Sequence, residues 1–107
     1  MNNEVYTIDL NLKRRMGLYG GGDDKCKAID LETGDILAIV EDFKDSIIFC
    51  KFIDDERFII ASLDGTISLM TLEGEVESRT IDEDITKMTI SEDSVVIGTA
   101  NGNVSLL

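Results

Sequence analysis

The sequence contains no histidine, no tryptophan and no proline. Without histidine, general-base catalysis and zinc binding lose the side chain on which they most often depend. No nucleophile has a recognisable base beside it. The glycines at 20–22 are followed by aspartates and by no Lys-Ser or Lys-Thr pair, so they do not form a phosphate-binding loop. We therefore predict that the protein is not an enzyme and binds no cofactor.

Cysteine and long apolar runs are also scarce. Cys26 and Cys50 are too few for a disulfide framework and indicate reduced thiols in a cytoplasmic or nuclear protein. No apolar run approaches the ~20 residues that span a bilayer. The first residues, Met-Asn-Asn-Glu, have neither the basic start nor the apolar centre of a signal peptide. We expect a cytoplasmic location, with the nucleus as an alternative.

Basic residues are outnumbered by acidic ones, 10 to 22, which gives a net charge of −12. A field of this sign repels nucleic acids and anionic membranes and attracts basic polypeptides. The excess is greatest in the second half of the chain, where Arg57, Arg79 and Lys87 are the only bases. Solubility is the alternative role for this charge.

Short apolar segments separated by turn signals predict antiparallel β-strands. Apolar residues alternate, as at Ile67 and Leu69, which is the period of a strand and not of a helix. Asp64-Gly65 and Asn101-Gly102 are strong hairpin signals. Close backbone packing is expected at the glycines 20–22. Strands are predicted at residues 4–11, 15–21, 25–31, 35–40, 46–52, 58–62, 66–72, 75–81, 85–91, 95–100 and 103–107.

The strand pattern repeats with a period of about 40 residues. The turns before each third strand fall at Asp24, Asp64 and Asn101, and the first strands of the units begin near residues 4, 46 and 85. A four-stranded unit repeated at this period is typical of stacked β-sheet architectures. We predict an all-β chain with units at about 4–42, 45–82 and 85–107, the last unit lacking its outer strand.

The Asp64-Gly65-Thr66 turn before a third strand resembles WD repeats. In that family a turn Asp, a strand Ser or Thr, a His and a Trp form a hydrogen-bonded network within each blade, and Ser62 and Asp64 match two of these places. Ile29 stands where Trp is typical, and Phe43 stands where His is typical. The resemblance implies an incomplete WD-repeat β-propeller of about three four-stranded antiparallel blades.

A propeller closes with roughly 4–8 blades, so three blades cannot close alone. We expect either a fragment or shortened form of a longer protein, or self-association of chains through the open blade faces. Three segments are similar to the group of WD-repeat proteins around the angio-associated migratory cell protein and a fungal chaperone of a large-subunit ribosomal protein. That similarity implies an acidic surface that holds a basic segment of a newly made ribosomal protein. The segments are residues 21–25, 43–47 and 97–103.

In a propeller, the connections between blades and the turns before third strands meet on one rim, which WD proteins commonly use for binding. We predict that this rim binds a basic polypeptide, and we expect Asp24 and Asp64 also to cap their turns. The acidic clusters lack EF-hand spacing, so no metal site is predicted. The alternative is a general scaffold whose acid serves solubility only. The predicted binding residues are Asp23, Asp24, Glu41, Asp42, Asp45, Asp64, Asp82, Glu83 and Asp84.

Overall fold

A computed structural model describes residues 3–91, 94–102 and 104–106, and their regular structure is entirely β-strand. No helix that could cross a membrane occurs among them. Every strand end lies within one residue of its predicted place, except that the expected ends at Asn103 and Leu107 lie outside the described residues. The strands are β1 (Val5–Asn11), β2 (Met16–Gly21), β3 (Cys26–Asp30), β4 (Ile36–Val40), β5 (Ile47–Phe52), β6 (Phe58–Ser62), β7 (Thr66–Thr71), β8 (Gly74–Thr80), β9 (Ile85–Ser91), β10 (Ser94–Thr99) and β11 (Val104–Leu106).

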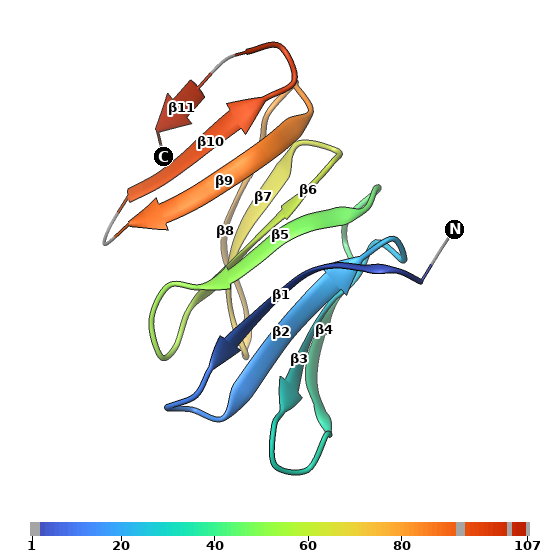
Figure 1. The fold of residues 1–107 in the computed structure, drawn as a ribbon, viewed down its shortest axis with the longest axis vertical. Helices are drawn as coiled ribbons and strands as arrows, with labels where there is room; N and C mark the ends of the chain where they lie inside the picture. The colour runs from blue at the N-terminus through green and yellow to red at the C-terminus, as the bar shows by residue number, and fades with distance from the viewer. Residues whose placement is uncertain (1–2, 92–93, 103, 107) are drawn as a thin grey trace.

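The strands form three antiparallel sheets in chain order, β1–β4, β5–β8 and β9–β11. The sheets stand side by side as an open stack (Figure 1), so the middle sheet has a neighbour on each face. The third sheet has three strands among the described residues, and β8, whose sequence is polar, is an edge strand of the second sheet. The predicted all-β fold of an incomplete propeller is confirmed.

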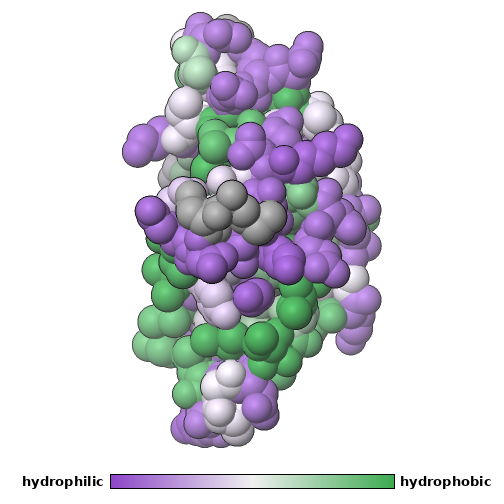
Figure 2. All heavy atoms as spheres, turned by 90° about the vertical axis from the view of Figure 1, so that its right-hand side faces the viewer, coloured by the Kyte–Doolittle hydropathy of each residue, from purple (hydrophilic) through white to green (hydrophobic). Residues whose placement is uncertain are grey.

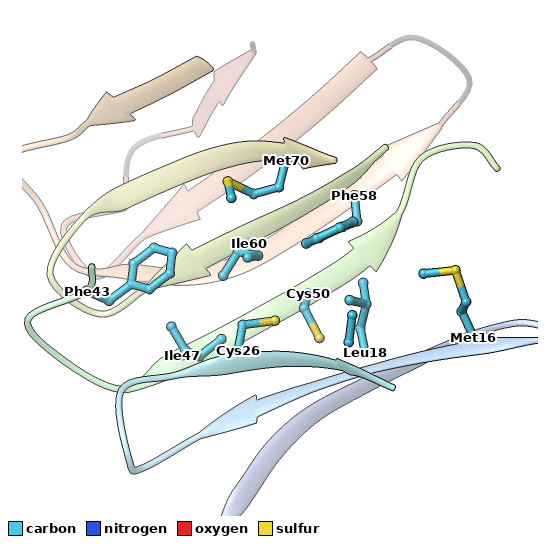
Figure 3. Packing of buried hydrophobic residues seen from close by; sticks show 10 residues of the cluster. Met16, Leu18, Cys26, Phe43, Ile47, Cys50, Phe58, Ile60 and Met70 are labelled. Carbon is cyan, nitrogen blue, oxygen red and sulfur yellow. The ribbon is translucent and has the colours of Figure 1, made fainter. Parts of the chain in front are cut away.

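Apolar side chains fill the two spaces between the sheets. Leu18, Ile47 and Ile60 are fully buried between the first and second sheets (Figure 3). Ile85 and Ile97 are equally buried between the second and third. The phenylalanines at 43, 49, 52 and 58 belong to these cores.

Glycine is required where backbone comes close. A Cβ on Gly20 would lie 2.6 Å from Ile47 Cγ2 of the neighbouring sheet, which explains the small residues at the end of β2. Gly65, in the β6–β7 turn, has φ +90°, and a Cβ there would lie 2.0 Å from the Ile81 carbonyl oxygen. The Asp64-Gly65 hairpin signal therefore marks a turn that a larger residue could not form.

Two hydrogen bonds connect β1 to the edge of β5, strands that lie in different sheets. The Cys50 amide donates to Thr7 Oγ1 at 3.2 Å. The Phe52 amide donates to Asp9 Oδ2 at 2.8 Å. Because β5 is the edge strand of its sheet, these side chains satisfy amides that would otherwise lack a partner. They also fix the position of the second sheet along the first.

Candidate protein-binding rim

All nine predicted binding residues lie in connections at the same end of the sheets. Because consecutive antiparallel strands run in opposite directions, every second connection falls at this end, which faces the viewer in Figure 2. Hydrophilic side chains cover its middle and upper parts, and apolar ones gather lower, over the first sheet. We call these residues the acidic rim: Asp23, Asp24, Glu41, Asp42, Asp45, Asp64, Asp82, Glu83 and Asp84.

Asp64 holds two segments of the rim together. Its Oδ1 accepts the Thr66 amide at 2.7 Å, which caps the β6–β7 turn as predicted. Its Oδ2 accepts the Lys44 amide at 2.8 Å, from the connection between β4 and β5. Burial acts to raise the pKa of Asp64, but these amides and the hydroxyls of Thr66 and Ser62 outweigh it and lower the pKa. Asp64 therefore stabilises the rim as a carboxylate.

Ser62 extends this hydrogen-bonded cluster towards Asp45. The Ser62 hydroxyl accepts the Asp64 amide at 3.2 Å and donates to the Asp45 carbonyl at 2.9 Å. The Asp45 carboxylate accepts the amide of Ser46 at 2.7 Å. Phe43, at the place of the family's His, is buried in the core instead. The Ser–Asp half of the expected network therefore forms here without His or Trp.

The first-sheet part of the rim is partly neutralised by lysines. Lys27 Nζ lies 3.8 Å from Asp23 Oδ2, and Lys25 Nζ lies 3.9 Å from Glu41 Oε2. The prediction that Asp24 caps its turn is wrong. Asp23 accepts the Lys25 amide at 3.2 Å, and Asp24 adopts the left-handed conformation with φ +64°. Asp tolerates the left-handed conformation, so Asp24 supplies the backbone bend of the turn, and the neighbouring Asp23 side chain caps it.

Glu83 joins the third sheet to the connection before it. Its Oε1 accepts the Thr99 hydroxyl at 3.1 Å and the Asn101 side-chain amide at 3.0 Å. The Asp84 carbonyl accepts the Ala100 amide at 2.9 Å. Glu83 is therefore a structural carboxylate, which its place in an acidic run did not indicate.

The remaining rim carboxylates point to solvent. Asp42, Asp82 and Asp84 are exposed, and Asp24 is half-buried. Across the described residues, the carboxylates of these four make no hydrogen bond or ion pair. They are free to meet a ligand without any loss of internal contacts.

A groove of about 370 Å³ opens beside the rim, between the outer strands of the first and second sheets. Ile39, Phe43 and Met70 contribute apolar surface to it, whereas Glu41, Asp42 and Glu75 supply carboxylates. No lysine or arginine among the described residues lines this groove. The groove therefore combines apolar walls with negative charge, an arrangement that suits the stem and head of a basic side chain.

The opposite end of the sheets carries charge of both signs. Lys13 Nζ lies 2.8 Å from Asp55 Oδ2 there, and the guanidinium of Arg57 donates to Asp54 Oδ2 at 2.8 Å. The pKa of Asp54 is lowered by the Glu56 amide and then by Arg57. This end is therefore internally paired, and its carboxylates are less available to a basic ligand.

No catalytic arrangement was identified in the described part of the chain, and no group of three or more Cys, Asp or Glu residues there could hold a metal ion. The thiols of Cys26 and Cys50 lie side by side in the first core (Figure 3). Their mutual hydrogen bond, together with burial, raises the pKa of Cys26. These thiols pack as small apolar groups.

Comparisons with known proteins agree with this architecture. The computationally designed Ika8 protein has 20% sequence identity and a TM-score of 0.86, over 99% of this chain and 33% of that one. The C-terminal WD40 domain of Sif2 has 17% identity and a TM-score of 0.90, over 99% and 32%. At these identities the likeness concerns the fold alone, and this chain spans about a third of either structure. No curated protein sequence matches. A family model for the WD40-like domain matches residues 3–107, and the chain therefore belongs to the WD40-like domain family.

Proposed function

We propose that this chain is a non-enzymatic protein-binding module that holds a basic polypeptide segment on its acidic rim. The observation that carries the proposal is the set of exposed carboxylates at Asp42, Asp82 and Asp84, which the fold does not use. Exposed charges without internal partners attract a ligand of opposite sign and steer its approach.

The groove beside the rim gives the ligand a second point of attachment. An arginine or lysine stem would lie along Phe43 and Met70, and its cationic head would approach Asp42 and Glu75. Burial of the stem adds an apolar contribution that salt does not screen. The ligand is therefore a polypeptide with spaced basic residues and not a diffuse cation.

A basic segment of a newly made large-subunit ribosomal protein fits this description, and the sequence similarity at residues 21–25, 43–47 and 97–103 supports it. The chain would then act as a chaperone that shields positive charge before assembly. The second candidate is a general scaffold whose acid serves solubility. The structural roles of Asp45, Asp64 and Glu83 favour this alternative, because they leave fewer acids for binding.

A charge-neutralised variant separates the two candidates. Asp42→Asn, Asp82→Asn and Asp84→Asn together remove three exposed contacts, each worth about 0.2–1 kcal/mol, so affinity for an Arg/Lys-rich peptide falls roughly 30-fold at low salt. The matched control removes three exposed carboxylates at the opposite end, at residues 35, 56 and 73. Fluorescence anisotropy with the basic peptide and a neutral scrambled peptide measures both variants.

We expect the wild-type chain to bind the basic peptide and not the neutral scrambled peptide. Added salt and the three rim substitutions should each weaken this binding. An equal loss in the control variant would show that only net charge matters. Failure of the wild-type chain to prefer the basic peptide at either of two salt concentrations would refute the proposed function.

A further inference from the structure

The face of the first sheet that points away from the second sheet is apolar and exposed. Residues alternate across a strand: Thr7 and Asp9 face β5, so Ile8 and Leu10 face outward. Their exposed fractions are 68% and 52%. The strand register places Ile8, Tyr19, Lys27 and Ile39 in one row and Leu10, Gly17, Ile29 and Ile36 in the next.

The first sheet and its connections hold most of the exposed large hydrophobic residues among those described. Nine of the twelve exposed large hydrophobic residues among those described lie between Val5 and Ile39. Figure 2 shows the largest gathering of apolar side chains over the first sheet, with smaller apolar areas higher up. Soluble monomers rarely expose an apolar patch of several hundred Å². Such a face is typical of a surface that binds a partner.

The outward face of the third sheet is of a different kind. Met88 and Ile90 pack towards the second sheet, so Lys87 and Thr89 of β9 face outward. The register puts Gly98 and Val104 in the row of Lys87. A Cβ on Gly98 would meet no atom within 4 Å, so this face is open. It is flatter and more polar than the face of the first sheet.

The contact between the first two sheets pairs the same two kinds of face. The second sheet presents bulky side chains, including Ile47, Phe58 and Ile60, to the first. The first sheet meets them with Met16 and Leu18 on β2, and with small or polar groups elsewhere, among them Ala28 and the hydroxyl of Thr7. By the strand register, Thr89 of β9 occupies the place on its sheet that Asp9 occupies on the first, and Lys87 occupies the place of Thr7. The two open faces of the chain thus correspond to the two halves of an interface that the chain already forms.

We propose that the open face of the first sheet binds the open face of the third sheet of a second copy of this chain. The contact is head-to-tail, so each copy offers one face of each kind. Thr89 would accept an amide from the free edge of the partner's first strand, as Asp9 accepts that of Phe52. The contact also brings two acidic rims side by side, and each chain carries a charge of −12. Association therefore strengthens with salt, opposite to peptide binding.

Two double variants with exposed substitutions test the contact. Ile8→Glu with Leu10→Glu disables the first-sheet face, and Thr89→Glu with Val104→Glu disables the third-sheet face. Leu72→Glu with Val76→Glu, on exposed residues of the second sheet and the turn before β8, is the matched control. Circular dichroism verifies that each variant is folded. Analytical ultracentrifugation measures mass at several concentrations and two salt concentrations.

We expect the wild type and the control to associate with increasing concentration. Each face variant alone should remain at the chain mass of 11.8 kDa. A mixture of the two face variants should form a species of twice that mass, because one intact face of each kind remains. A monomeric wild type would overturn the proposal and assign the face to another segment or partner.

Association of the third-sheet variant alone would also overturn it, since two first-sheet faces would then be meeting. So would loss of association in the control. Because the monomeric variants keep the acidic rim, peptide titration of these variants tests the proposed function separately.

Discussion

Asp64 is the rim residue on which the fold depends most, and Asp64→Ala measures that dependence. The substitution removes the acceptors of the Thr66 and Lys44 amides. The Thr66 amide is partly buried, so the loss of its bond to a carboxylate costs about 2 kcal/mol. The Lys44 amide is exposed and water replaces part of its bond, which leaves about 1 kcal/mol. The expected loss is about 3 kcal/mol from a total stability of about 5–15 kcal/mol.

This loss converts into a shift that thermal unfolding resolves. An unfolding entropy of about 2.1 cal/mol/K per residue gives about 0.22 kcal/mol/K for 107 residues, so the melting temperature falls by about 13 °C at neutral pH. Circular dichroism follows the unfolding of the wild type, Asp64→Ala and the control Asp82→Ala. The control removes a carboxylate that makes no internal bond and should change stability by less than about 0.5 kcal/mol.

The pH dependence supplies an independent check. The pKa of Asp64 lies below its ordinary value of 3.8 in the folded chain. Its contribution is therefore complete above that ordinary value and is lost as pH falls through the depressed folded-state pKa. The melting curves of wild type and Asp64→Ala should converge in acid. A shift below about 4 °C at neutral pH, or a difference that persists in acid, would refute the role of the carboxylate.

Two further predictions concern the first core. Gly20→Ala places a Cβ 2.6 Å from Ile47 Cγ2, and the overpacking should lower the free energy of unfolding by about 1–3 kcal/mol. Gly98→Ala, with open space around it, should leave stability nearly unchanged. Equal midpoints of urea unfolding for the two variants would contradict this. Cys26 and Cys50 are 1% and 3% exposed, so iodoacetamide should alkylate neither thiol in the native chain and both in urea, as mass spectrometry would show; rapid native labelling would contradict the packing.

The sequence alone was sufficient to predict the strands and the end of the sheets at which the acids lie. Alternating residues such as Ile67 and Leu69 define a strand locally, and Asp64-Gly65 defines the turn before it. Once the strands are consecutive and antiparallel, the end at which each connection lies follows from topology. These features depend only on neighbours in the chain, which explains why they could be predicted.

The division of the rim into structural and free carboxylates could not be predicted. Whether the Asp64 carboxylate is engaged in an internal hydrogen bond depends on Lys44, 20 residues earlier, and on how two connections meet in space. The lysines that approach Asp23 and Glu41 extend from β3 and from the residue just before it. They lie outside the acidic segments from which the rim was predicted. The groove depends on the spacing of two sheets, which no single segment encodes.

The hydrogen bonds from Thr7 and Asp9 to β5 give the first two sheets a fixed alignment. An interface made only of hydrocarbon can shift by a fraction of a residue at little cost, because dispersion contacts have no direction. A hydroxyl or carboxylate that must meet one particular amide permits only one alignment. Over the described residues of β5 and β9, no side chain forms such a bond, so the third sheet is held by apolar contact and by its connection. We therefore expect the first two sheets to keep their alignment when a ligand binds, and any adjustment of the stack to occur at the connection that contains Asp82 and Asp84.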